Sequence, residues 1–403
     1  MLQPVVQRMR IFRFVPVLLF LAVLQLLAQS SEPKAERARS LGVPFEGVPG
    51  ALDAITDVPG IEVGNTTLIA DTPGAQDKAV RTGVTVVLPR GRRDNDPVYA
   101  GWFSQNGNGE MTGTTWIEES GFLEGPVAIT NTHSVGVVRD AIIAWGLQHG
   151  QSRSAWSLPV VAETWDGWLN DINGFHVKPE DLFHALDTAA GGPVPEGDVG
   201  GGTGMVCYGF KGGIGTASRI LTHDDGGFTI GVLVQCNCGR RPQLTIAGVP
   251  VGREIPDSVP YAQSVPAPPG SATEGDVGSI IIVIATDAPL LPHQLKRLAK
   301  RATMGLARTG STSGNSSGDI FLAFSTANPH ADRPPGPNPV LTVSDERISP
   351  LFTATVEATE EAIVNAMVGA KSMTGRDGHV VIQLPHGRMQ KALTKYGRLE
   401  PIE

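Results

Sequence analysis

Five short apolar runs limit what this chain can fold into more than any other feature of its sequence. Each is rich in Val, Ile and Phe and is bounded by Gly, Asp or Pro, which is typical of β-strands; they are residues 84–88, 228–234, 279–285, 320–324 and 379–384. Stretches with apolar residues at helical spacing lie between them, at residues 135–148, 179–189, 292–308 and 356–368. Strands, paired helices and strands follow one another without the strict alternation of a doubly wound parallel sheet. The pattern therefore predicts an α+β layered sandwich.

The first 28 residues have the layout of a secretory signal. Arg8, Arg10 and Arg13 precede an apolar run over residues 14–28. This run is shorter than the roughly 20 residues that a membrane-spanning helix needs, and polar residues follow it. We therefore predict that residues 1–28 are a signal peptide that is removed, and that the mature protein is periplasmic or secreted. A membrane anchor is the less favoured alternative.

The remaining part of the chain, about 370 residues, is long enough for one large core or for two domains. Its Pro-rich stretch at residues 256–276 suits an exposed loop. We prefer a surface insertion to an interdomain linker, because apolar strands stand on both sides of it. The net charge of -8 is spread over the sequence in both signs, which argues against a nucleic-acid partner.

The cysteines give no sign of a disulfide framework or a metal site. Cys207, Cys236 and Cys238 are odd in number and form no CxxC pair, so we expect them to fill space in the core. Residues 223–227 offer possible ligands but are more typical of a hairpin turn, and the glycines of residues 200–215 lack the spacing of a nucleotide fingerprint. We therefore predict no metal and no cofactor.

Residues 310–319 are all small or polar and lie between a basic helical stretch and an apolar strand. Their composition alone suits an ordinary loop. A serine in such a loop could also attack the carbonyl before it and move the acyl group to its oxygen, after which water would complete the cleavage. A serine at a chain start carries its own base, because the α-amine has a pKa of about 7.7 to 8.0. The absence of HExxH and of Gly-x-Ser-x-Gly favours such a site over a metalloprotease or a triad hydrolase.

Seven segments, in order, resemble the P1 family of self-cleaving peptidases, the L-aminopeptidase/D-alanine esterases and β-peptidyl aminopeptidases. They are residues 107–113, 131–136, 163–167, 201–213, 234–237, 285–289 and 317–319. The resemblance implies a four-layered α/β/β/α sandwich of the N-terminal-nucleophile-hydrolase kind, commonly a homotetramer. It also implies one catalytic domain cut into residues 29–316 and 317–403, which acts on peptides, amides or esters with a free amine.

The resemblance assigns roles to single residues. Ser317, directly before Gly-Asp, is the expected nucleophile and new N-terminus, and Ser316 before it is the rival start. Asn237 is expected to donate to the oxyanion, and Glu163 to hold the amino group of the substrate. Trp165 stands where some members have a tyrosine, so it would wall the pocket without adding a hydroxyl.

Thr355 and Glu357 are similar to a hydroxyl-x-Glu pair that polarises the nucleophile and its amine. Residues two apart do not face the same way on a regular helix, so the helix would have to begin near Glu357 for both to reach Ser317.

Two alternatives remain from the sequence. A self-processing acyltransferase of the ornithine acetyltransferase type would use threonine as its new terminus, which Ser317 argues against. A catalytically inert binding homologue would have no need to split into two fragments. The sequence leaves the preference among α-peptides, β-peptides, D-alanine amides and esters open, because pocket shape decides it.

Overall fold

The structure is a computed structural model that describes residues 36–151, 154–260, 278–333 and 336–401. The predicted signal peptide lies outside these residues, as does most of the predicted insertion at 256–276. Arg37–Glu403 form one compact unit. None of the helices in the described ranges is both long and apolar enough to cross a membrane.

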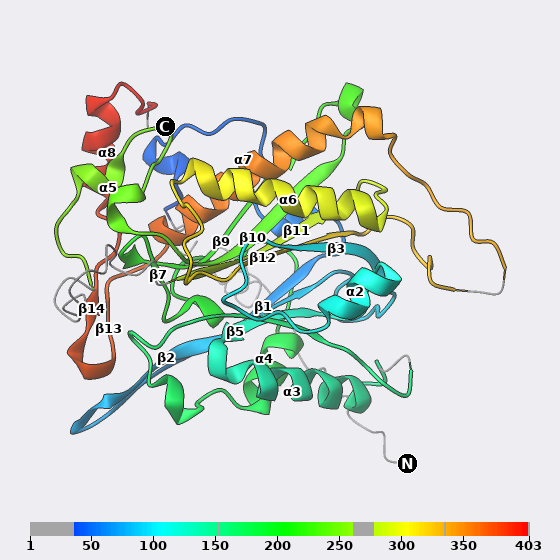
Figure 1. Cartoon of the computed structure of the whole chain (residues 1–403), viewed down its shortest axis with the longest axis horizontal. Helices are drawn as coiled ribbons and strands as arrows, with labels where there is room; N and C mark the ends of the chain where they lie inside the picture. The colour runs from blue at the N-terminus through cyan, green and yellow to red at the C-terminus, as the bar shows by residue number, and fades with distance from the viewer. Residues whose placement is uncertain (1–35, 152–153, 261–277, 334–335, 402–403) are drawn as a thin grey trace, which may run out of the picture. The chain divides into compact units, whose positions relative to one another are not determined.

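Two β-sheets lie face to face between two layers of helices (Figure 1). The six-stranded sheet has the order β4 (Phe122–Leu123), β3 (Val98–Ser104), β12 (Asp319–Ser325), β11 (Ser279–Thr286), β10 (Thr229–Asn237), β9 (Gly213–Ile220). The four-stranded sheet has the order β1 (Glu62–Thr72), β2 (Ala75–Leu88), β5 (Val127–Asn131), β6 (Val160–Thr164).

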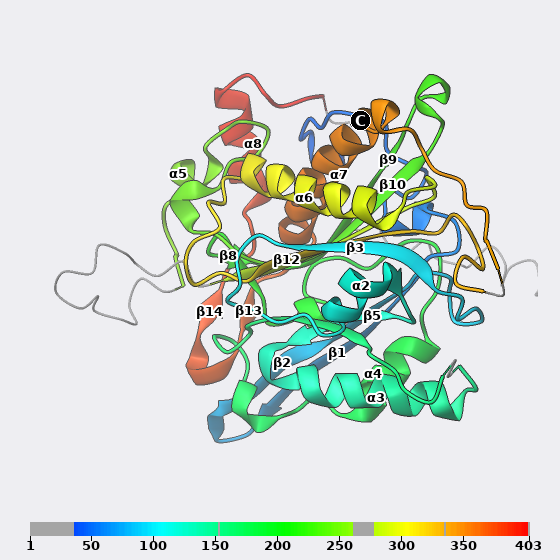
Figure 2. The same ribbon diagram turned by 45° about the vertical axis from the view of Figure 1, so that its right-hand side comes forward.

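The outer layers are pairs of helices (Figure 2). The helices α6 (Pro292–Arg308) and α7 (Ser349–Val368) cover the six-stranded sheet, and α3 (Val135–Gln148) and α4 (Pro179–Asp187) cover the four-stranded one. The predicted four-layered α/β/β/α sandwich is thus confirmed. Smaller elements surround these layers: α2 (Thr114–Ser120), α5 (Val251–Glu254), α8 (His386–Lys395), the pair β7 (Val206–Cys207) and β8 (Phe210–Lys211), and the pair β13 (Met373–Thr374) and β14 (Val380–Val381).

The central strand β11 explains why the apolar runs were so clear in the sequence. Ile280 and Ile282 pack toward α6 and α7, whereas Ile281 and Val283 pack toward the other sheet. A strand buried on both faces needs an unbroken apolar run rather than an alternating one. The run at residues 379–384, by contrast, contributes only the two-residue strand β14.

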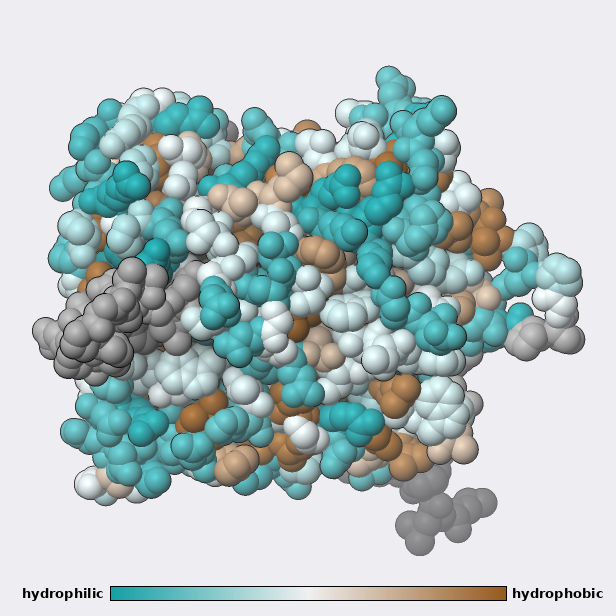
Figure 3. Space-filling view, in the orientation of Figure 1, coloured by the Kyte–Doolittle hydropathy of each residue, from teal (hydrophilic) through white to brown (hydrophobic). Residues whose placement is uncertain are grey.

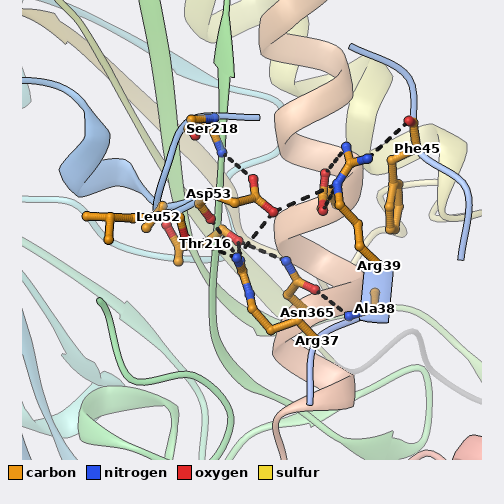
Figure 4. Close-up of polar contacts among 12 residues, drawn as sticks. Arg37, Ala38, Arg39, Phe45, Leu52, Asp53, Thr216, Ser218 and Asn365 are labelled. Atoms are coloured by element: carbon orange, nitrogen blue, oxygen red, sulfur yellow. Dashed lines mark hydrogen bonds and ion pairs between the residues drawn. The ribbon is translucent and has the colours of Figure 1, made fainter. Parts of the chain in front are cut away.

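The N-terminal segment of the described chain is tied to α7 by buried polar contacts (Figure 4). The Arg39 Nε lies 2.7 Å from a Glu361 carboxylate oxygen, and the Arg219 Nη2 lies 2.8 Å from the other. The Ala38 N–H donates to Asn365 Oδ1 at 3.0 Å. Because Glu361 is fully buried, these contacts fix the segment as part of the core rather than as a loose tail.

The face shown in Figure 3 is mainly hydrophilic, and its apolar side chains lie in small, separate groups. Among the large apolar side chains exposed in the described residues is Trp165, with 36% of its surface accessible. Trp165 follows β6 directly, so this exposed indole belongs to the region where the predicted site residues lie.

Candidate active site

One end of the six-stranded sheet collects polar residues from three neighbouring strands. Asn237 is the last residue of β10, and its partner across the antiparallel ladder is Ser279, the first residue of β11. Ser317 lies two residues before β12, which runs parallel to β11. All three side chains are buried, with 2%, 6% and 2% of their surfaces exposed for Asn237, Ser279 and Ser317.

Ser279 is the functional candidate that the sequence analysis missed. As cross-strand partners, Ser279 and Asn237 present their side chains on one face about 5 Å apart. The Gly318 N–H donates to Ser279 Oγ at 3.0 Å, which links this hydroxyl to the peptide directly after Ser317. A Cβ on Gly278 would lie 2.2 Å from the Asn237 carbonyl oxygen, so the residue before Ser279 must be glycine. The available signal was a Gly-Ser step between a Pro-rich loop and an apolar strand.

Ser317 forms a hydroxyl–carboxylate couple with Asp319. Its Oγ donates to Asp319 Oδ1 at 2.6 Å, and Asp319 is fully buried. The Asn108 side-chain amide donates to the Ser316 carbonyl at 2.8 Å, and the Asn108 N–H donates to the Ser317 carbonyl at 3.3 Å. The loop of residues 107–113 therefore holds the backbone on both sides of Ser317.

Asn237 has its amide orientation fixed by two backbone groups. Its Oδ1 accepts the Val206 N–H at 2.8 Å, and its Nδ2 donates to the Trp165 carbonyl at 3.0 Å. Reversing the amide would break both bonds, because each would then join two like groups. Within the described residues the second N–H of Nδ2 has no partner, so it is available to a ligand at this edge.

Glu163, in β6, is a buried carboxylate close to these strand ends. Only 3% of its surface is exposed, and its oxygens accept the Glu110 N–H at 3.0 Å and the Thr132 hydroxyl. Burial raises the pKa of Glu163, while the Thr132 and Glu110 hydrogen bonds lower it. A Cβ on Gly109 would lie 3.1 Å from Gly318 Cα and 3.3 Å from Glu163 Oε1. Gly109 therefore lies between the Glu163 carboxylate and the backbone directly after Ser317.

The structure does not bring Thr355 and Glu357 to Ser317, and that prediction is wrong. The helix α7 begins at Ser349, so both residues lie within its regular part, and the Thr355 hydroxyl donates to the Leu351 carbonyl at 2.7 Å. The Glu357 carboxylate lies 3.6 Å from Arg219, which pairs with Ile230 in β10. Ile230 is about 20 Å from Asn237 along the strand at the usual rise per residue. Both residues therefore belong to the far end of the sheet.

The expectation that the cysteines only fill space is also wrong. Cys207 and Cys236 form a disulfide, and Cys238 is a buried thiol outside it, with its sulfur 3.9 Å from that of Cys236. The same-side placement of Cys236 and Cys238 follows from their spacing of two in extended chain at the end of β10, where Cys238 is the first residue after the strand. An odd cysteine count concealed the pair, because it permits one bridge and one remaining thiol.

A serine-lined strand edge and a nearby buried carboxylate, on a four-layered sandwich, define the class of N-terminal-nucleophile-type hydrolases. A solved structure similar to this chain carries that description: the L-aminopeptidase D-Ala-esterase/amidase from Ochrobactrum anthropi, described as a prototype for the serine aminopeptidases and a new variant of the Ntn hydrolase fold. It is 50% identical, covers 90% of this chain and 99% of its own, and has a TM-score of 0.82. A Burkholderia β-aminopeptidase is 48% identical, with 90% and 99% coverage and a TM-score of 0.80.

The sequence profile of peptidase family S58 matches residues 53–381, and the chain belongs to this family. A beta-peptidyl aminopeptidase, BapA of Sphingosinicella microcystinivorans, is 54% identical over 382 residues, which are 93% of this chain and 96% of the relative. The protein is therefore an enzyme, an aminopeptidase of family S58.

Proposed function

We propose that the chain is exported, cuts itself once, and then removes N-terminal aminoacyl groups from peptides, amides or esters through an acyl-enzyme. The observation that carries this proposal is the meeting of serine hydroxyls with the Asn237 amide at one sheet edge, near the buried Glu163 carboxylate. A nucleophile, an oxyanion donor and an anion for the substrate amine are the groups that aminopeptidase chemistry needs.

The sequence analysis made Ser317 the nucleophile, but the geometry favours Ser279 for this role, with Ser317 beside it. Ser279 starts a central strand directly opposite Asn237, whereas Ser317 precedes its strand and has its hydroxyl bonded to Asp319. The residue before Ser279 is a glycine, whose carbonyl carbon is the least hindered toward attack. We therefore propose that the cleavage divides residues 29–278 from residues 279–403, in place of 29–316 and 317–403.

In the proposed maturation, the Ser279 hydroxyl attacks the Gly278 carbonyl carbon. The C–N bond breaks as the acyl group moves to the oxygen, and the proton from the hydroxyl ends on the freed amine. Water then hydrolyses this ester, which leaves the Gly278 carboxylate and a Ser279 with a free amine and a free hydroxyl. The amine is now the base next to the hydroxyl that it must deprotonate.

In the proposed turnover, Glu163 holds the ammonium of the substrate and Ser279 attacks the adjacent carbonyl. The second N–H of Asn237 donates to the oxyanion, a contact worth about 10²- to 10³-fold in rate in other hydrolases. The Ser279 amine, which has taken the proton of the hydroxyl, gives it to the leaving group. Water then attacks the acyl-enzyme, and the amine takes a proton from this water and returns it to the Ser279 oxygen. Trp165 walls the site on its open side.

The couple of Ser317 and Asp319 takes the role that the sequence analysis gave to Thr355 and Glu357. It is also a hydroxyl two residues before a carboxylate, and the Gly318 N–H between its members already contacts Ser279 Oγ. A hydroxyl hydrogen-bonded to a buried carboxylate is a strong acceptor, so it can orient the new amine toward the Ser279 hydroxyl.

The signal pattern supports export, and the resemblance to the self-cleaving peptidases supports a homotetramer. The name of the 54% identical relative makes β-peptides the first substrates to assay. The acyltransferase alternative needs a threonine at the new terminus, whereas this edge presents Ser279 and Ser317.

Alanine variants of the two serines test the proposal. Ser279→Ala is expected to stay in one piece and to release no aniline from aminoacyl anilides. Ser317→Ala is expected to be cleaved more slowly and to retain weak hydrolysis, and Ser311→Ala, in the same loop, to behave as wild type. Cleavage and hydrolysis by Ser279→Ala at the wild-type rate would return the nucleophile to Ser317.

A further inference from the structure

A short segment wraps around the end of β10, where Asn237 lies. The Val206 N–H donates to Asn237 Oδ1 at 2.8 Å, and two residues later the Tyr208 N–H donates to the Cys238 carbonyl at 2.7 Å. Both hydrogen bonds are buried, and the first of them is one of the two contacts that fix the orientation of the Asn237 amide. The position of the Val206 backbone therefore controls where the remaining N–H of this amide points.

The disulfide lies between these two hydrogen bonds. It joins Cys207, the residue after Val206, to Cys236, the residue before Asn237, and the two Cα atoms are 5.8 Å apart. Neighbouring side chains of a strand point to opposite faces. Cys236 packs on the side of α7, with Val234, so Asn237 points to the other face. The strand end is thus held covalently on one face and through the Asn237 side chain on the other.

We propose that the Cys207–Cys236 disulfide is a positioning device for the oxyanion donor Asn237. This inference rests on the proposed function. Without the bond, the Val206 N–H is held at the strand end by non-covalent contacts alone, namely hydrogen bonds and the apolar packing of its segment. When the Val206 backbone shifts, the Asn237 amide can rotate with it, and its second N–H then no longer points at the oxyanion. A misplacement of about 1 Å in such a group can cost about 100-fold in rate.

The third cysteine provides the matched control. Cys238 is on the other side of Asn237, is 1% exposed, and is outside the disulfide. Its backbone carbonyl accepts the Tyr208 N–H, a hydrogen bond that a side-chain substitution leaves in place, and its sulfur lies 3.9 Å from that of Cys236. Loss of this buried thiol tests whether any disturbance next to Asn237 is enough to lower the rate.

A disulfide that only stabilises the fold would give a different result. Its removal would lower the melting temperature but leave the turnover of the remaining folded molecules unchanged. A positioning role predicts a loss in kcat with an almost unchanged KM, because oxyanion contacts form in the transition state and not in the bound substrate. It also predicts that the loss depends on Asn237.

The experiment is a double-mutant cycle on the mature, cleaved enzyme with an aminoacyl anilide. We expect Cys207→Ala to lower kcat by about 10- to 100-fold with KM within about twofold. We expect Cys238→Ala to stay within about twofold of wild type, and Cys207→Ala to cost less than about twofold when Asn237→Ala is already present. Equal losses in both backgrounds would overturn the proposal.

Thiol titration of the denatured wild type gives a second readout, with one thiol per chain expected before reduction and three after it. If Cys207→Ala does not mature, dithiothreitol treatment of the mature wild type replaces it, and the same kcat loss must reverse on reoxidation with oxidised glutathione. Three thiols before reduction, or no kcat loss after complete reduction, would also overturn the proposal. A wild type without aminopeptidase activity would instead refute the proposed function, and the thiol count would still report on the disulfide.

Discussion

Replacing Glu163 by glutamine removes the charge that we assign to substrate binding and keeps the shape of the side chain. In the structure only 3% of this residue is exposed, and the Glu110 N–H that it accepts at 3.0 Å can equally donate to a glutamine carbonyl. The Thr132 hydroxyl, which donates to the other carboxylate oxygen, can reverse and accept from the glutamine amide, so the main loss is the ion pair with the substrate ammonium. Loss of one partner from a buried, hydrogen-bonded charge pair costs about 2–5 kcal/mol. At about 3 kcal/mol, kcat/KM falls by roughly 150-fold.

The assay compares an aminoacyl anilide with the matching acyl anilide in which hydrogen replaces the amine. Glu163→Gln is expected to lose its roughly 150-fold only on the first substrate, because the second makes no ion pair. Glu110→Gln changes an exposed carboxylate of the neighbouring loop, whose backbone N–H donates to Glu163, and as the control it should stay within about twofold. Equal losses on both anilides would refute the assignment of Glu163 to the amine.

The pH dependence gives an independent check of the same residue. Burial raises the pKa of Glu163 above its ordinary value, so the carboxylate becomes protonated at a higher pH than an exposed glutamate when the pH falls. The amine-dependent part of kcat/KM should therefore fall on the acid side, through this raised pKa. Glu163→Gln should lack that acid limb.

Three further changes test other parts of the structure. Gly278→Ala should block self-cleavage on a denaturing gel, because its Cβ would lie 2.2 Å from the Asn237 carbonyl oxygen, whereas Gly387→Ala, with open space around its Cβ, should cleave normally. Asp166 is fully buried and its pKa is raised from 3.8 to about 7, so the folded state keeps a proton that the unfolded state gives up. The wild-type melting temperature should therefore fall as pH rises across this range, and Asp166→Asn should make that slope shallower, because the pKa of Asp53 is raised in the same way and its contribution remains. Glu361→Gln should lower the free energy of unfolding in urea by about 3 kcal/mol, because it breaks the buried ion pairs with Arg39 and Arg219. The kcat of the folded enzyme should not change, and a changed kcat would show that these ion pairs contribute to catalysis.

The layered fold could be predicted from the sequence because its signals are local. The stretch at residues 292–308 has a proline at its start and a strong helical period, and it is the helix α6 (Pro292–Arg308). The run at residues 279–285 is apolar at every position after Ser279, and it forms the doubly buried strand β11. The start of α7 was missed by seven residues, because Ser349–Thr355 carry no cap stronger than Pro350.

The site was only partly predictable, because sheet register brings its members together. Motifs pointed to Asn237 and Glu163 as candidates, but nothing in the local sequence states that Asn237 pairs with Ser279. Thr355 and Glu357 have the spacing of a hydroxyl-x-acid pair, but Glu357 contacts Arg219 at the end of the sheet opposite to Asn237. The pair of Ser317 and Asp319 has the same spacing at the correct end, and only the fold distinguishes the two.

The N-terminal residue of the smaller fragment tests the central claim most directly. Purified mature enzyme, separated on a denaturing gel, gives this fragment for N-terminal sequencing and for intact mass measurement. The account predicts a fragment that begins Ser279-Ile280-Ile281 and ends at the chain terminus. A fragment that begins at Ser316 or Ser317, or a fully active enzyme that is a single uncut chain, would contradict it.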